Sequence, residues 1–168
     1  AHLDARYTVD QVERERIPVN GRVLIIANHP SGALDALALL HFVGGIRRDV
    51  KIVANDMLCE FEGLKELLLP LRILGGKPQP ESLQAIEQAL ENEECVIVFP
   101  AGEVSRLSWK GISDSEWRRG FLRFAKNTST PVLPVKIQAR NSAFFYGASI
   151  LHKPIGTALL PREVFSRR

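Results

Sequence analysis

Residues 22–40, RVLIIANHPSGALDALALL, predict a buried strand that leads through a short loop into a helix. The apolar and mostly branched run at 23–26 favours an extended chain. Asn-His-Pro-Ser-Gly follows, and residues of these types form turns. A helical pattern begins near Leu34, with Asp35 in the first turn, where unpaired backbone N–H groups favour negative charge. The strand therefore delivers His29 to a loop beside an anion that could orient its ring.

The composition is that of one folded domain. The chain has 168 residues, 45% of them hydrophobic and 24% charged, which is enough to bury a sizeable core. We predict an N-terminal arm or lead-in helix over residues 1–20 and one domain over 21–168. Because the chain opens at Ala1 without a methionine, we expect a fragment or a trimmed chain. The cysteines Cys59 and Cys95 have no paired spacing, so neither a disulfide framework nor a metal site is predicted.

Apolar strands and helices alternate along the chain. The pattern predicts strands near residues 23–27, 50–54 and 95–99 and helices near residues 34–43, 61–69 and 83–90. A further apolar run at 132–137 contains Pro134, which fits only an edge strand or a bulge. This order predicts an α/β domain with a mostly parallel central sheet and helices on both faces. In such sheets the loops after the strands open at one edge, so the loop with His29 and the loop at 99–103 should share a crevice.

A possible membrane-binding face lies further along the chain. Trp117, Phe121 and Phe124 repeat at helical spacing beside basic residues. Such a face can be ordinary solvated surface, packed core, or a contact with anionic lipid. The net charge of +3 suits an anionic membrane surface without selecting it. No apolar run is long enough to cross a bilayer, and no nucleic-acid recognition module or dense basic stripe is present.

Three common chemistries are excluded by inspection. The sequence has no G-x-S-x-G elbow, no Walker loop and no G-x-G-x-x-G after the first strand. The loop at 28–32 instead offers a histidine, and a histidine can take a proton from an attacking alcohol. Two interpretations of His29 stay open on spacing alone: a general base, or a loop histidine that satisfies its own backbone. Ser31 and Gly32 are also residues that any tight strand-to-helix turn would use.

Three strings resemble, in order, the motifs of the lysophospholipid acyltransferase family, which includes the glycerol-phosphate acyltransferases. They are NHPSGALD at 28–35, FPAGEVSR at 99–106 and VLPV at 132–135. The likeness spans residues 17–137 and is strongest to a bacterial branch of hemolysin-like proteins and ornithine-lipid acyltransferases. A Trp-x-x-Gly-Phe stretch at 117–121 and Arg-Asn-Ser at 140–142 extend it. The resemblance implies a glycerol-phosphate acyltransferase-like fold.

The resemblance also implies a reaction. An acyl group would pass from acyl-CoA or an acyl carrier protein to a hydroxyl of a lyso-lipid, as in the acylation of 1-acylglycerol 3-phosphate. His29 would act as the general base and Asp35 would hold its imidazole, with no metal and no cofactor besides the donor. The oxyanion would also need hydrogen-bond donors, which the sequence alone does not identify; backbone N–H groups near Gly102 are candidates. The implied substrate-binding residues are Ser31, Gly32, Phe99, Pro100, Gly102, Glu103, Ser105 and Arg106. We expect an enzyme of phospholipid biosynthesis that binds peripherally to the cytoplasmic face of the inner membrane.

Two departures from the family pattern bear on these expectations. Five residues separate His29 from Asp35 where the commonest signature has four, and Gly32 can absorb the extra residue. Ala101 stands where the second motif usually has an acidic residue. Glu103 would oppose a phosphate, so it would either bind a cationic or hydroxyl-bearing head group or pair with an arginine. Arg106 would either bind a phosphate or stay solvated. The altered motif keeps an alternative open: a non-catalytic lipid- or carrier-binding module with the same fold.

Overall fold

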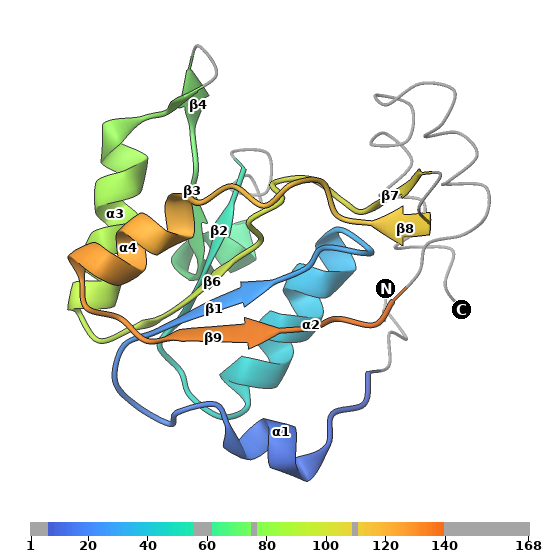
Figure 1. Cartoon of the computed structure of the whole chain (residues 1–168). Coiled ribbons are helices and arrows are strands. Elements are labelled where there is room, and N and C mark those ends of the chain that lie inside the picture. The colour runs from blue at the N-terminus through green and yellow to red at the C-terminus, as the bar shows by residue number, and fades with distance from the viewer. Residues whose placement is uncertain (1–6, 56–61, 75–76, 109–110, 140–168) are drawn as a thin grey trace.

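The computed structural model describes residues 7–55, 62–74, 77–108 and 111–139, and for residues 62, 106–108, 111 and 112 it describes the backbone alone. These residues form three layers, a central sheet between helices (Figure 1). The Arg-Asn-Ser stretch at 140–142 lies outside the described residues. Helix α1 (Gln11–Glu15) falls within the predicted N-terminal arm, whose boundary with the domain stays a prediction.

The central sheet has five strands, and every pairing in it is parallel. In spatial order they are β3 (Leu68–Pro70), β2 (Val50–Ala54), β6 (Cys95–Val98), β1 (Val23–Ala27) and β9 (Val132–Val135). Strand β1 lies between β6 and β9, and all five of its residues are buried. The prediction of a mostly parallel sheet is therefore confirmed.

Helices cover both faces of this sheet, as the alternation of strands and helices predicted. Alternate residues of β1 contribute to two different clusters of buried side chains. One cluster contains Val23, Ile25 and Ala27 with Leu39 and Val43 of α2 (Ala33–Gly44). The other contains Leu24 and Ile26 with Ile86 and Leu90 of α3 (Pro80–Glu91) and Phe124 of α4 (Gly120–Asn127). Because both of its faces are buried, β1 is a continuous apolar run.

The predicted helix at 61–69 is wrong at its last two residues, Leu68 and Leu69, which are extended, and the helix before them is of the 3-10 type. The structure has a 3-10 helix, η2 (Glu62–Leu67), followed by the edge strand β3, which pairs with β2. Pro70 has no N–H to donate, so it suits the end of a strand at an edge better than a helix interior. Pro134 shows the same preference, because β9 is the other edge strand and pairs only with β1.

Two short hairpins were not predicted. They are β4 (Ile73–Leu74) with β5 (Lys77–Pro78), and β7 (Arg106–Ser108) with β8 (Gly111–Ser113). Both follow the carboxyl ends of sheet strands, β3 and β6, so they extend the edge at which His29 emerges. Within the described ranges, no helix combines the length and the apolar character needed to span a bilayer.

Candidate active site

Asn28 determines how the chain leaves β1. Its side-chain amide donates to the carbonyl of Ile137 at 2.9 Å, and its Oδ1 accepts the Ile137 N–H at 2.6 Å. These two bonds continue, through a side chain, the pairing of β1 with the segment that follows β9. The loop that carries His29 therefore starts from a fixed point at the edge of the sheet.

The side chains of His29 and Asp35 are in contact. His29 Nδ1 lies 3.1 Å from Asp35 Oδ2, and the two side chains are only 17% and 1% exposed. The contact is short but poorly aligned, since Nδ1 has no well-directed hydrogen bond to any described residue; such bonds often tighten only when substrate is bound. Gly32 absorbs the extra residue between them by adopting φ 75° and ψ −132°, a conformation that other residues avoid. The sequence interval is therefore compatible with a dyad.

Asp35 is held by the turn that precedes it. Its Oδ2 accepts the backbone N–H groups of Ser31 at 2.7 Å and Gly32 at 3.0 Å, and its Oδ1 accepts the Ser31 hydroxyl. Asp35 also occupies the first turn of α2, where the helix dipole favours an anion. The polar groups of Ser31 and Gly32 thus face Asp35 in this structure, and their predicted contact with substrate stays a prediction.

Phe99 supports the other side of the histidine. The two rings stack with their centroids 4.0 Å apart and their planes inclined by 24°. Phe99 directly follows β6, and β6 pairs with β1, so adjacent strands bring the two rings together. With Nδ1 directed to Asp35, the tautomer that carries its proton on Nδ1 leaves Nε2 free to accept a proton. The arrangement suits a general base.

The second motif forms a tight turn beside this histidine. Pro100 and Ala101 are buried, so the residue that replaces the usual acid points into the interior. Gly102 is exposed and has φ 69°. Its own N–H donates to the Phe99 carbonyl at 3.0 Å, and a role of backbone N–H groups near Gly102 at the oxyanion stays a prediction. Glu103 is partly exposed in the same turn.

The last two predicted residues of this motif have different surroundings. Ser105 is buried, and its N–H donates to the His29 carbonyl at 2.8 Å. Arg106 begins β7 and pairs with Ser113, but its side chain lies outside the described part of the structure. Its predicted phosphate contact therefore stays a prediction.

Sequence reasoning missed Arg118 as part of the site. Its N–H donates to the Pro100 carbonyl at 3.0 Å, and its Nε lies 3.9 Å from where a Cβ on Gly102 would be. The side chain is exposed and forms no ion pair with the described residues. Its guanidinium thus lies over the glycine turn of the second motif, where it can meet an anionic substrate.

Asp114 was also missed, although it contacts the histidine directly. Its two carboxylate oxygens lie 3.2 and 3.3 Å from the His29 N–H that donates to them. It further accepts the Ser105 hydroxyl and, at 2.9 Å, the indole N–H of Trp117. The backbone of His29 is consequently bonded on both sides to a segment far along the chain.

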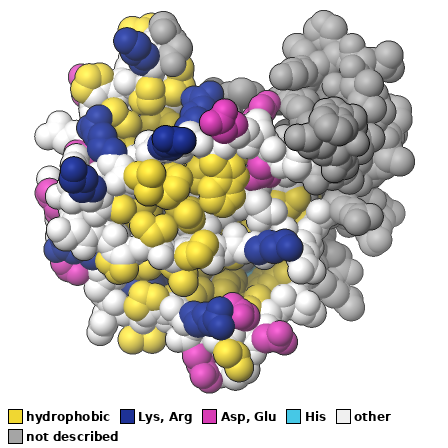
Figure 2. Space-filling view, viewed as in Figure 1, with side chains coloured by type: hydrophobic (Ala, Val, Ile, Leu, Met, Phe, Trp, Pro, Cys, Tyr) yellow, Lys and Arg dark blue, Asp and Glu magenta, His cyan; other side chains and the backbone are white. Residues whose placement is uncertain are grey.

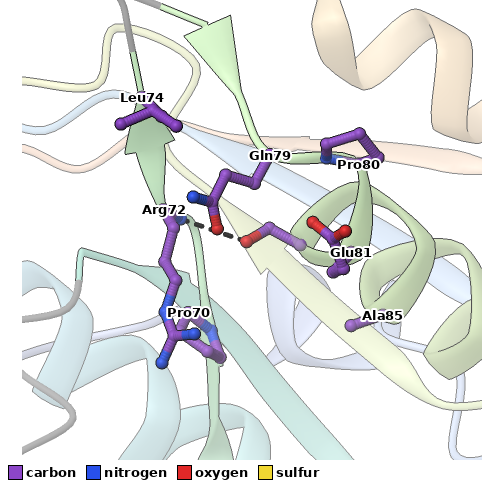
Figure 3. A pocket seen from close by; sticks show the side chains of 8 residues that line it. Pro70, Arg72, Leu74, Gln79, Pro80, Glu81 and Ala85 are labelled. Atoms are coloured by element: carbon purple, nitrogen blue, oxygen red, sulfur yellow. Dashed lines mark hydrogen bonds between the residues drawn. The ribbon is translucent and has the colours of Figure 1, made fainter.

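A separate pocket of about 560 Å³ lies between the end of β3 and the start of α3. Figure 3 shows Arg72, Gln79 and Glu81 among its side chains, with the bond from the Arg72 N–H to the Ser82 hydroxyl at 3.1 Å. The pocket shares the sheet edge with His29, but β3 and β1 are three positions apart, about 14 Å at about 4.8 Å per strand.

The face around α4 combines apolar and basic side chains. Figure 2 shows hydrophobic side chains gathered on this side of the molecule, with Lys and Arg around them. Phe124 is buried and Phe121 is partly buried, so the predicted aromatic face is largely core, while Leu122 is 51% exposed. Arg123 is already paired with Glu87 at 3.4 Å. The described residues contain no cluster of His, Cys, Asp and Glu side chains that could bind a metal ion.

Comparisons with known proteins identify the family of this chain. The chain is 31% identical over 155 residues to a lyso-glycine lipid O-acyltransferase of Phocaeicola vulgatus, and 32% identical over 155 residues to one of Bacteroides thetaiotaomicron. Each alignment covers 92% of this chain but only 54% or 56% of the relative, so the chain spans about half the length of these curated relatives. A family profile described as acyltransferase matches residues 4–167. The chain therefore belongs to the acyltransferase family.

Proposed function

We propose that the protein transfers an acyl group from an acyl thioester, acyl-CoA or acyl carrier protein, to a hydroxyl of a lyso-lipid. The observation that carries this proposal is the contact between His29 and Asp35 at the carboxyl edge of a parallel sheet, within a chain of the acyltransferase family. The relatives named lyso-glycine lipid O-acyltransferase support the same class of acceptor.

In the proposed mechanism, Nε2 of His29 takes the proton of the acceptor hydroxyl while its oxygen attacks the thioester carbonyl. Asp35 stabilises the imidazolium that forms. The tetrahedral intermediate then collapses, the carbon–sulfur bond breaks, and the leaving thiolate takes the proton from His29. The products are the ester and the free thiol. The lyso-lipid is itself the nucleophile, so no acyl-enzyme forms.

The surroundings of the turn at 99–103 favour an acceptor with an anionic head group. Arg118 places a guanidinium over Gly102, and Arg106 begins the strand that follows the turn. A planar guanidinium suits a carboxylate or a phosphate equally well. Glu103 would restrict the size and placement of that head group, because it repels an anion at its own position.

We also propose that the protein binds peripherally to an anionic bilayer at the cytoplasmic face of the inner membrane, as an enzyme of phospholipid or related lipid biosynthesis. The exposed Leu122 supports this placement, together with the exposed Arg119 and Lys126 on the same helix or at its start. Leucine would enter the head-group layer while the cations meet anionic lipid. Sedimentation with anionic vesicles, and not with zwitterionic ones, tests this placement.

The test of the reaction is a panel of acyl-CoA and acyl carrier protein donors against lyso-lipid acceptors, read by lipid mass spectrometry. His29→Ala should lower kcat by about 10²–10⁴-fold. His41→Ala is the matched control, since His41 is an exposed histidine on α2 that contacts Tyr7 and not the dyad. Wild-type kcat in His29→Ala would refute the mechanism. Binding of lyso-lipid without any acyl product would instead support the non-catalytic module.

A further inference from the structure

We infer that Asp114 is a positioning residue for His29, acting on its backbone while Asp35 acts on its ring. This inference rests on the proposed function for its effect on turnover, but it rests on geometry for the contact itself. The His29 N–H donates to the Asp114 carboxylate at 3.2 and 3.3 Å to its two oxygens. Asp114 is half-buried, immediately after β8.

Other donors keep this carboxylate in place. The Ser105 hydroxyl donates to Oδ1, and the Trp117 indole N–H donates to Oδ2 at 2.9 Å. Trp117 also packs against the core cluster that contains Phe124 and α3 residues. Asp114 therefore links the histidine loop to the hydrophobic core through an indole ring.

The same segment bonds to both sides of the catalytic crevice. Besides Asp114, the Ser115 hydroxyl donates to the Ala101 carbonyl at 3.4 Å, and the Arg118 N–H donates to the Pro100 carbonyl at 3.0 Å. We call residues 114–118 the strap. It contacts the loop after β1 and the turn after β6, so it sets the spacing between the general base and the turn expected to hold the substrate.

Loss of this contact should change turnover more than binding. The ring of His29 has two remaining supports, Asp35 and Phe99, which restrain its direction. Its backbone keeps only one of its two bonds to described residues, the one from the Ser105 N–H to the His29 carbonyl. A displacement of about 1 Å at a reacting group can lower a rate about 10²-fold. Asp114 touches neither substrate in the proposed mechanism, so KM should stay nearly constant.

The variants form a graded set with a matched control. Asp114→Ala removes the acceptor from all three donors, whereas Asp114→Asn keeps one oxygen. Asp49→Ala is the control, because Asp49 is also half-buried and accepts two bonds from Arg47, each at 2.7 Å, at the opposite, amino edge of the sheet. Asp49→Ala therefore removes a structural carboxylate that does not contact the site.

Two measurements test the inference. The protein contains four histidines, so labelling with ¹⁵N-histidine isolates few amide signals. The hydrogen exchange rate of the His29 amide should be at least about tenfold higher in Asp114→Ala than in the wild type, and unchanged in Asp49→Ala. With donor and acceptor, kcat should fall about 10–100-fold in Asp114→Ala and less in Asp114→Asn, with KM within about twofold.

The outcomes separate the two proposals. A kcat within twofold of wild type in Asp114→Ala, or an equal loss in Asp49→Ala, overturns the positioning role even if His29→Ala is inactive. Absence of transfer by the wild-type protein with every donor and acceptor overturns the proposed function. In that case the amide exchange still decides whether Asp114 restrains His29, since that measurement needs no substrate.

Discussion

Replacement of Asp35 by asparagine separates its two tasks, orienting His29 and capping α2. The amide has the shape of the carboxylate, so its oxygen can replace Oδ2 and keep the bonds from the N–H groups of Ser31 and Gly32. Its NH₂ group then faces the Ser31 hydroxyl, which can rotate to accept. The turn survives, but His29 loses the negative charge that stabilises its protonated form.

Asp35→Asn should cost little stability but much of the turnover rate. Each of the bonds to Asp35 changes from charge-assisted to neutral, a loss of about 1 kcal/mol each, partly offset because a neutral amide costs less to bury than a carboxylate. The net loss in the free energy of unfolding should be about 1–2 kcal/mol, which a domain stable by about 5–15 kcal/mol survives. The loss in kcat should be about 10²–10⁴-fold, since the imidazolium is no longer stabilised.

Two further variants complete the comparison. Asp35→Ala leaves three buried donors of Ser31 and Gly32 without an acceptor, at about 1–3 kcal/mol each, so it should lower the melting temperature far more than Asp35→Asn. Glu81→Gln is the control for helix charge, because Glu81 is exposed in the first turn of α3. Its kcat should not change.

The assays are acyl transfer under saturating substrates and thermal unfolding followed by circular dichroism. If Asp35→Asn is folded and retains a kcat within threefold of wild type, then Asp35 is only a helix cap. The 3.1 Å contact between His29 and Asp35 would then have no role in catalysis.

Two other predictions concern Arg118 and Cys95. Arg118→Ala should raise KM about tenfold for an acceptor with an anionic head group and leave kcat within threefold. The same substitution at its exposed neighbour, Arg119→Ala, is the control and should change neither KM nor kcat. An equal KM in the two variants would contradict the anionic subsite. Burial raises the pKa of the Cys95 thiol from 9.0 to about 12. Because the folded pKa is raised, this group favours folding below about pH 9 and loses that contribution as pH rises toward 12. At pH 10 urea unfolding should show wild type losing about 1.4 kcal/mol more than Cys95→Ala, relative to pH 8; an identical loss in both would contradict this.

The strand, loop and helix around His29 could be predicted because their signals are local. The apolar run, the turn residues and the helix start lie within about 20 residues, and each is set by short-range chemistry. Strand β3 could not be predicted in this way. Its leucines suit a helix equally well, and only its pairing with β2 selects the extended form.

Asp114 was missed for a different reason. It lies 85 residues from His29 and binds a backbone N–H, a group that every residue but proline carries. Such a contact places no requirement on the type of the donating residue, so the sequence carries no signal that links residue 29 to Asp114. Arg118 was noticed only as one charge of a basic face, because its position over Gly102 depends on how the strap crosses the turn.

The geometry of the site depends on the register of two buried strands. In β1 and β6, Val23 lies opposite Cys95 and Ile26 opposite Val98, so the two strands end within one residue of each other. A slip of one residue would exchange the faces of the strand that slips and place its side chains in the wrong cluster. The stacking of His29 on Phe99 is therefore as stable as the core that selects this register. The strap lies outside that core, apart from Trp117, so substitutions there can change the position of the histidine and the substrate contacts without changing the fold.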